Sequence, residues 1–246
     1  MPKPPKSKVK AAPRQAPAAA VVTPPPPSWP PFKPPLPDAD LDLECVVQDK
    51  IVVLRSFFPR SLCRDYVAFL KELPLTTTPG KPKRGEALRV NDRYQINDAA
   101  FAHRLWSETG LKDALLHADV AGSWGGDVVG LNQNIRVYRY LKGHFFDAHY
   151  DDSNNVTVTT DSDDQVQAKT TWTLLLYLTS SSEGCSGGET VFYPHDRRSA
   201  KEEIAVSPET GMLLLHKHGD DCLLHEGREV TAGEKWILRT DLCVKR

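Results

Sequence analysis

Residues 134–151 read NIRVYRYLKGHFFDAHYD, and this stretch combines a strand pattern with two chemically active side chains. Apolar and polar residues alternate over Ile135–Tyr140, which predicts a half-buried β-strand. The stretch ends in His149-Tyr150-Asp151. Residues two apart project to the same side of an extended chain, so His149 and Asp151 can hold one face of a metal ion.

Further strands are predicted through the C-terminal half of the chain. Together with the first they are Ile135–Tyr140, Thr171–Leu178, Glu189–Phe192, Gly211–Leu215, Leu223–His225 and Lys235–Asp241. Antiparallel strands of this number, joined by glycine-rich turns, fit a double-stranded β-helix of the jelly-roll kind. We therefore expect a mainly β (α+β) fold with a jelly-roll core over about residues 131–246 and a ligand pocket in its mouth.

The preceding segment, about residues 39–130, is predicted to be a helical support for this core. Ser61–Leu73 has apolar residues at spacings of three and four and is followed by Pro74, as expected for an amphipathic helix. Ala99–Trp106 and Leu111–Ala118 are predicted to be further helices. Short strands are expected at Cys45–Val47 and Ile51–Leu54. Residues 39–246 would then form one domain.

Residues 1–38 have a different composition, with proline runs at Pro24–Pro27 and around Pro30–Pro35, alanine clusters and scattered lysines. Such a segment cannot form a core, so we expect a disordered or locally polyproline II tail. It is either a solvated leader, or a ligand for an aromatic groove on a partner module, or a weak basic nuclear address. The lysines of that address are Lys3, Lys6, Lys8 and Lys10.

The composition indicates an enzyme-sized globular domain. The chain has 246 residues, 40% of them hydrophobic, which is enough for a sizeable core. The formal net charge of -1 argues against polyanion binding, so nucleic acid is not an expected partner. No apolar run is long enough to cross a membrane and no secretory signal is recognisable, so we expect a cytoplasmic or nuclear protein without a membrane partner. The five cysteines are odd in number and form no C-x-x-C pair, which favours reduced thiols: Cys45, Cys63, Cys185, Cys222 and Cys243.

Four ordered motifs surround the His149-x-Asp151 pair. They are Tyr140-x-x-Gly143-x-x-Phe146-x-x-His149-x-Asp151, Thr173-x-Leu175-x-Tyr177-Leu178, Gly187-Gly188-Glu189-Thr190-x-Phe192, and His225-Glu226-Gly227-Arg228-Glu229-Val230-x-x-Gly233-x-Lys235-Trp236. In order and spacing they resemble the catalytic domain of the 2-oxoglutarate-dependent dioxygenases, and within these the prolyl 4-hydroxylase type. The resemblance covers roughly residues 132–242.

The resemblance implies a catalytic iron centre. His149, Asp151 and His225 match the Fe(II) ligands, and two imidazoles with one carboxylate leave positions open for a bidentate cosubstrate and for O2. Lys235 matches the cation that pairs with the far carboxylate of 2-oxoglutarate, and Tyr177 matches a hydroxyl donor to the same carboxylate. A dianion in an apolar barrel needs such partners. Ascorbate is a further implied cofactor. The candidate cofactor-binding residues are Lys235, Tyr177, Arg239, Tyr140 and Thr173.

Several positions leave alternatives open. Arg239 lies on the same side of the last strand as Lys235, so either could pair with the cosubstrate; the Gly233-x-Lys235-Trp236 context favours Lys235, with Arg239 as a second cation or a substrate contact. Phe146 stands where the family pattern often has tyrosine, so that hydroxyl is missing here.

Other histidines compete with His225 for the distal ligand position. His216 and His218 are expected at a strand end and turn, and only His225 has a basic residue at the family distance. His144 and His195 are expected at the surface or behind the ligands.

The resemblance implies hydroxylation of a C–H bond in a peptide or protein, on a prolyl or other side chain, with succinate and CO2 as coproducts. Two alternatives stay open: the same chemistry on a small molecule or a methylated nucleobase, and a barrel that binds metal without turnover. The Asn91–Tyr94 stretch and a polar, acidic loop at Ser153–Gln167 are expected to border the iron. An acidic rim favours a basic peptide, unless these acids only solvate a mobile lid. Arg93 and Arg136 could instead contact a substrate carboxylate or phosphate.

Overall fold

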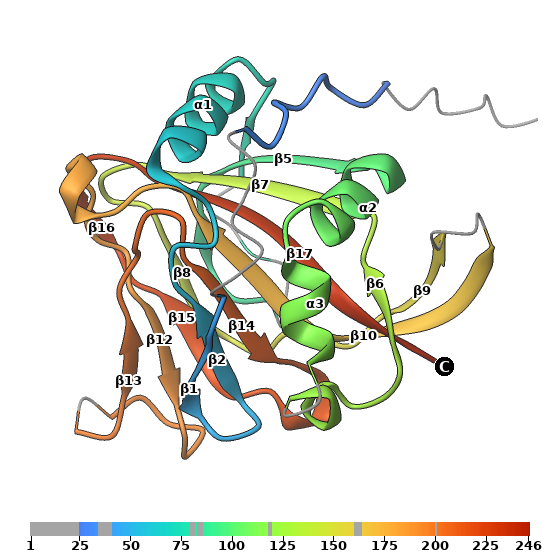
Figure 1. The fold of residues 1–246 in the computed structure, drawn as a ribbon. Helices are drawn as coiled ribbons and strands as arrows, with labels where there is room; N and C mark the ends of the chain where they lie inside the picture. The colour runs from blue at the N-terminus through green and yellow to red at the C-terminus, as the bar shows by residue number, and fades with distance from the viewer. Residues whose placement is uncertain are drawn as a thin grey trace, which may run out of the picture.

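Two antiparallel sheets face one another and three helices cover the outer side of the larger sheet (Figure 1). The structure is a computed structural model that describes residues 25–33, 41–78, 82, 86–117, 120–159, 164–199 and 201–246. The helices are α1 (Arg60–Lys71), α2 (Ala99–Ser107) and α3 (Leu111–Leu116), and the 3-10 turns are η1 (Ala121–Trp124), η2 (Ser181–Glu183) and η3 (Gly219–Asp221).

The larger sheet has ten strands. Its order is β1 (Leu43–Val47), β2 (Ile51–Leu54), β14 (Leu213–Lys217), β10 (Gln165–Tyr177), β17 (Lys235–Lys245), β7 (Asn134–Tyr140), β5 (Asp92–Asn97) and β3 (Thr76–Thr77), with β6 (Val128–Leu131) paired to β17 and β9 (Asn155–Thr159) paired to β10. The smaller sheet runs β13 (Ile204–Val206), β12 (Thr190–Tyr193), β15 (Leu224–Gly227), β8 (Phe145–His149) and β4 (Arg89–Val90). A separate pair joins β11 (Ser186–Gly187) and β16 (Val230–Ala232).

Strand β10 supplies both hydrophobic layers of the fold. Trp172, Leu174 and Leu176 pack with the helices in the outer core. Leu175 and Tyr177 belong to the inner core between the two sheets. Because successive side chains point to opposite faces, a shift of one residue would exchange the two sets. Coverage on both faces also explains the nearly continuous apolar run at the end of β10, Trp172–Tyr177.

Strand β17 alternates in the same way, and its inner face carries charge. Trp236 and Leu238 lie in the outer core, whereas Ile237 lies in the inner core. Lys235 and Arg239 share the face of Ile237 and therefore point between the sheets. Strand β17 is hydrogen-bonded to both β10 and β7, which fixes the depth at which these two cations enter the inner layer.

The jelly-roll prediction is confirmed, but the expectation of a loop at Ser153–Gln167 was wrong. The expected loop at Ser153–Gln167 contains strand β9 and the start of β10, which pair as a hairpin (Figure 1). Valine and threonine alternate in Asn155–Thr159, and such β-branched residues favour a β-strand. In the described part of the support segment 39–130, strands β1 to β5 and the start of β6 accompany the helices. Ala118, the last residue of the third predicted helix, lies outside the described residues. So do Asp161 and Asp163, two acidic residues of the predicted loop at Ser153–Gln167.

Part of the proline-rich tail packs on the domain, contrary to the prediction that it stays free. Trp29 is 8% exposed, stacks on Phe101 and donates a hydrogen bond from Nε1 to Asp98 at 2.8 Å. Asp98 also caps helix α2 by accepting from the backbone N–H of Phe101. Tyr66 donates to the carbonyl of Pro30 at 3.1 Å. Residues 25–33 therefore form a strap across α1 and α2 (Figure 1); residues 1–24 lie outside the described part of the chain.

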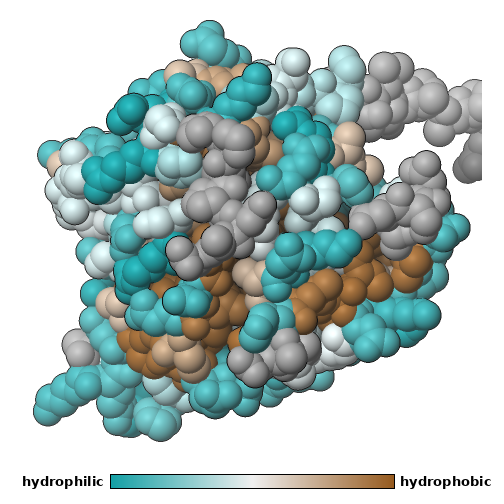
Figure 2. All heavy atoms as spheres, viewed as in Figure 1, coloured by the Kyte–Doolittle hydropathy of each residue, from teal (hydrophilic) through white to brown (hydrophobic). Residues whose placement is uncertain are grey.

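Helices of the described residues are too short and too polar to cross a membrane. The face seen in Figure 2 is largely hydrophilic, with an apolar band near β6 and the β9–β10 hairpin. A small third core cluster lies there, made of Val158, Ala168 and Cys243 with Val129 and Val156 against it.

We expect Trp29→Ala to lower the free energy of unfolding by about 3 kcal/mol, the usual loss for truncating a large buried aromatic residue. Ser28→Ala, at an exposed neighbouring position, is the matched control and should change little. Urea unfolding monitored by circular dichroism measures both. Equal stability of the two variants would show that the strap adds nothing to the fold.

Candidate active site

His149 and His225 are direct neighbours across two strands of the smaller sheet. Their Cα atoms are partners in the β8–β15 register. Each ring donates from Nδ1 to a carbonyl two residues earlier, His149 to Asp147 at 2.8 Å and His225 to Leu223 at 2.9 Å. These bonds fix the tautomer and leave each Nε2 with a free lone pair.

Asp151 lies between the two imidazoles. Its carboxylate oxygens are 3.8 Å from Nε2 of His149 and 3.8 Å from Nε2 of His225. The backbone around it is held, because Gly219 donates to its carbonyl at 2.8 Å and its own N–H donates to Cys222 Sγ at 3.3 Å. Burial alone would raise the pKa of Asp151, but Arg239 and the surrounding histidines hold that pKa well below its usual range.

These three groups fit a divalent metal ion. Their ligand atoms lie within 4.8 Å of one another. Burial lowers the pKa of both His149 and His225, so at neutral pH both imidazoles are unprotonated and can donate a lone pair. Two neutral nitrogens and one carboxylate suit Fe(II) with open coordination positions.

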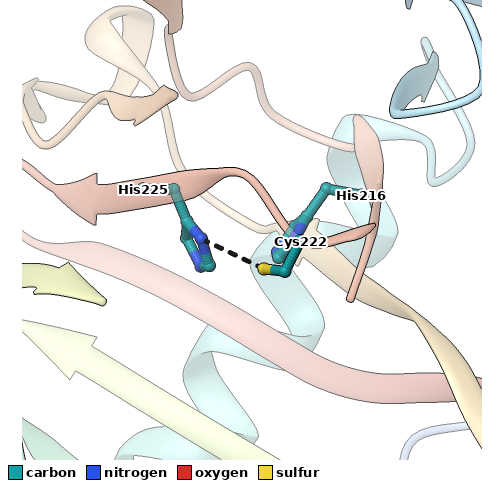
Figure 3. Close-up of side chains that lie close together, drawn as sticks. All are labelled: His216, Cys222 and His225. Atoms are coloured by element: carbon teal, nitrogen blue, oxygen red, sulfur yellow. Dashed lines mark hydrogen bonds between the residues drawn. The ribbon is translucent and has the colours of Figure 1, made fainter. Parts of the chain in front are cut away.

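A second grouping shares His225 but fits iron less well. His216, Cys222 and His225 also offer ligand atoms within 4.8 Å of one another (Figure 3). The thiolate is the form of cysteine that binds metal, but burial raises the pKa of Cys222 to about 11. His225 would also have to serve both groupings. His149, Asp151 and His225 are therefore the better-suited metal-ligand candidates.

The position of His216 was missed from the sequence. It is 2% exposed, its Nε2 is 3.8 Å from Asp151 Oδ2, and its buried Nδ1 has no hydrogen-bond partner. The alternation of β14 was a usable signal, because His216 shares the inward face of Leu214. His218 is instead satisfied, bonded to Thr173 and Thr170 through its two nitrogens at 3.0 Å each.

Two further histidines weighed from the sequence, His144 and His195, make no hydrogen bond or ion pair with the ligand candidates among the described residues. His195 is exposed, as expected, and His144 is half-buried. The structure therefore gathers His149, His216 and His225 around Asp151 and leaves the others outside.

Lys235 marks the other end of the site. Its side chain is buried, and Nζ donates to the carbonyl of Gly188 and lies 5.4 Å and 5.3 Å from the rings of Tyr140 and Tyr177. Among the described residues no carboxylate pairs with it. Burial lowers the pKa of Lys235 to about 8. A buried ammonium without an anionic partner suits a ligand carboxylate.

One pocket joins the metal-ligand candidates to Lys235. Tyr177 is hydrogen-bonded to one of the residues that line this pocket, because its hydroxyl is 2.6 Å from the hydroxyl of Thr190. Thr190 was part of a sequence motif but was not predicted as a site residue. The pocket is lined by Tyr138, Tyr140, Phe146, His149, Asp151, Leu175, Thr190, His216, His225, Glu226, Gly227, Lys235, Ile237 and Arg239.

Residues 135–240 match the family model of the 2OG-Fe(II) oxygenase superfamily. This match covers 106 of the 246 residues, less than half of the chain. Prolyl 4-hydroxylase 2 of Arabidopsis thaliana is 29% identical over 168 residues, which are 59% of this chain and 53% of the relative. The chain thus spans about half the length of the curated relative it matches.

Solved structures show the same fold. The viral collagen prolyl hydroxylase of Paramecium bursaria Chlorella virus-1 has a TM-score of 0.52 at 18% identity, over 79% of this chain and 96% of that chain. A Pseudomonas putida prolyl-4-hydroxylase has a TM-score of 0.53 at 18% identity, over 80% of this chain and 94% of that chain.

Arg239 and Thr173 contact Asp151 rather than Lys235. Arg239 donates to Asp151 Oδ2 at 2.8 Å and to the Thr173 hydroxyl at 3.2 Å. Thr173 donates to the same Asp151 oxygen at 2.9 Å. The prediction of Thr173 as a contact of the cosubstrate carboxylate therefore does not fit its position. The geometry favours Lys235 over Arg239 as the partner of that carboxylate.

Phe146 packs directly on a ligand candidate. Its ring centroid is 3.6 Å from that of His149, with an interplanar angle of 20°. The aromatic face thus orients the imidazole by stacking, a role that requires no hydroxyl.

We expect Lys235→Met to stabilise the ligand-free protein by about 1–3 kcal/mol near pH 7, because removing an uncompensated buried charge is often favourable. In the folded chain the pKa of Lys235 is about 8, below its ordinary 10.5. The unfolded chain therefore keeps the proton to higher pH, so the penalty is full below about pH 8 and disappears as pH rises to about 10.5.

Urea unfolding at pH 7 and pH 10 measures this difference, with the exposed Lys169→Met as control. A loss of stability in Lys235→Met at both pH values would contradict the expectation.

Proposed function

We propose that this chain is an Fe(II)- and 2-oxoglutarate-dependent dioxygenase that hydroxylates a C–H bond of a prolyl or other side chain in a peptide or protein. Succinate and CO2 are the coproducts. The observation that carries this proposal is a single pocket with two imidazoles and a carboxylate at one end and a buried, unpaired ammonium at the other. The curated relative, at 29% identity, supports the prolyl assignment through its name.

His149, Asp151 and His225 would hold Fe(II), and Lys235 would pair with the far carboxylate of 2-oxoglutarate. When bound, the iron and its cosubstrate supply the oxidation that breaks the substrate C–H bond. Tyr140, Tyr177 and Thr190 enclose the Lys235 end, where two aromatic rings face the ammonium at 5.4 Å and 5.3 Å.

The protein also orients the carboxylate ligand. Arg239 and Thr173 both donate to Oδ2 of Asp151, whereas Oδ1 faces His149. The two donors restrict rotation of the carboxylate and satisfy one of its oxygens. The apolar side chains of Leu175 and Ile237 line the same pocket and keep water from its wall.

We expect anaerobic addition of Fe(II) and 2-oxoglutarate to produce a metal-to-ligand charge-transfer band that His149→Ala abolishes. In Lys235→Ala the dissociation constant of 2-oxoglutarate should rise about thirtyfold or more, since truncating one partner of a buried charge pair costs roughly 2–5 kcal/mol. His195→Ala, on the surface, is the control. No band with iron bound to the wild type would overturn the proposal.

Gly188→Ala should raise the dissociation constant of 2-oxoglutarate about tenfold, because small misplacements in such sites have large effects. An added Cβ would lie 3.0 Å from Lys235 Cδ and 3.0 Å from Val230 Cγ2. Gly184→Ala is the matched control: φ is +85° there and +75° at Gly188, but nothing lies within 4 Å of its Cβ position. Equal affinities in the two variants would contradict a role for Gly188 in placing Lys235.

A further inference from the structure

Arg93 and Arg136 lie on the neighbouring strands β5 and β7 but differ in their charge partners. Arg136 is paired with Asp241, whose side chain is 3% exposed. Arg93 donates only to the neutral amide oxygen of Gln95, and its buried Nε has no hydrogen-bond partner. In the part of the chain that the structure describes, no carboxylate pairs with Arg93. The guanidinium of Arg93 is therefore a half-buried charge without compensation.

Arg89 adds a second such charge from the opposite sheet. Its guanidinium lies 5.0 Å from the centre of the Phe146 ring, and that ring stacks on His149. Arg89 has no carboxylate partner recorded among the described residues. Burial lowers the pKa of Arg93, and the nearby positive charges of Arg89, Arg136 and Arg239 lower it further. The guanidinium groups are therefore close enough to repel one another.

The chain passes from one sheet to the other between these two arginines. Strand β4 ends at Val90 and β5 begins at Asp92, so Asn91 alone makes the crossing. Asn91 is fully buried. Its backbone N–H donates to the Thr78 hydroxyl at 3.0 Å, and its backbone carbonyl accepts from the N–H of Thr78 at 2.8 Å. This corner holds Arg89 in the smaller sheet and Arg93 in the larger one.

Both arginines are paired in register with residues of the pocket wall. Arg93 is opposite Tyr138 in the β5–β7 pairing. Arg89 is opposite Phe146 in the β4–β8 pairing. Tyr138 and Phe146 both line the pocket that contains the metal-ligand candidates. The positive charge thus borders the place where a substrate would approach.

Two carboxylates of this region already have cationic partners. Asp151 pairs with Arg239 and Asp241 with Arg136. Under the proposed function Fe(II) and Lys235 together offset the 2-oxoglutarate dianion, so it leaves no negative charge for Arg89 and Arg93. A planar guanidinium forms its strongest bonds with a carboxylate, which can accept two parallel hydrogen bonds.

We propose that Arg93 and Arg89 form a subsite for a carboxylate of the substrate, beside the C–H bond that is oxidised. The inference rests on the proposed function and names its substrate class. The carboxylate belongs either to an acidic residue next to the target residue of a peptide or to a small free acid. The charge preference is opposite to the one expected from the acidic loop at Ser153–Gln167.

Isothermal titration calorimetry of the full chain, anaerobic and with Fe(II) and 2-oxoglutarate, tests this subsite. The probes are two matched pairs: a capped pentapeptide containing aspartate before proline against its asparagine analogue, and N-acetylproline against N-acetylprolinamide. In at least one pair the acid should bind tenfold or more tightly than the amide, because a hydrogen bond to a charged group contributes about 1.5–3 kcal/mol. The pair that shows the difference identifies the source of the carboxylate.

Arg93→Gln should reduce this preference to within about threefold and leave the affinity for the amide unchanged. Arg89→Gln is the second variant, in case the first folds poorly. Arg197→Gln removes one positive charge from an exposed ion pair with Glu202 and should keep the preference. Equal binding of acid and amide by the wild type, no binding of either pair, or a preference that survives in both Arg93→Gln and Arg89→Gln would overturn the subsite.

The charge-transfer band, recorded on the same samples, separates the two proposals. An acid preference without the band would support the subsite and contradict the dioxygenase assignment. The band without an acid preference would support the dioxygenase assignment and contradict the subsite.

Discussion

Burial of β10 and β17 on both faces is the constraint on which the rest of the structure depends. Each strand packs one set of side chains under the helices and the other set between the sheets. Strand β17 cannot shift by one residue without placing Lys235 and Arg239 in the outer core and Trp236 in the pocket. The same shift of β10 would exchange Leu176 and Tyr177 between the two layers. The same packing that stabilises the fold therefore sets the depth of both buried cations.

The site combines rigid positioning with unfavourable charge. His149 and His225 are held by carbonyl bonds and by their cross-strand pairing, and Asp151 by Arg239 and Thr173. Lys235 has no carboxylate partner within the described residues, and burial lowers its pKa to about 8. Charges held without partners reduce the stability of the empty protein and favour binding of ligands that supply the missing partner. Lys235 and Arg93 both have this character, at different places around one pocket.

Much of the fold was predictable because the local spacing of apolar residues indicates helices and strands. The helices α1 and α2 and the strands β2, β7 and β12 begin and end within a few residues of the predicted bounds. Strand β9 was not recognised, because polar residues around Asn155–Thr159 outweighed its alternation. The strap at Trp29 was missed for a similar reason. Proline-rich composition predicts the absence of a local core, but it says nothing of an aromatic surface formed by Tyr66 and Phe101 far along the chain.

The sequence by itself determined the jelly-roll class and, through motif spacing, the residues His149, Asp151, His225 and Lys235 as the set to examine. Only the tertiary structure decided which groups contact them. Thr173 and Arg239 contact Asp151, His216 joins the same cluster, and Arg93 is left unpaired while Arg136 is neutralised. The physical reason is that periodicity reports the face on which a side chain lies, whereas charge partners come from strands separated by as many as 105 residues in sequence.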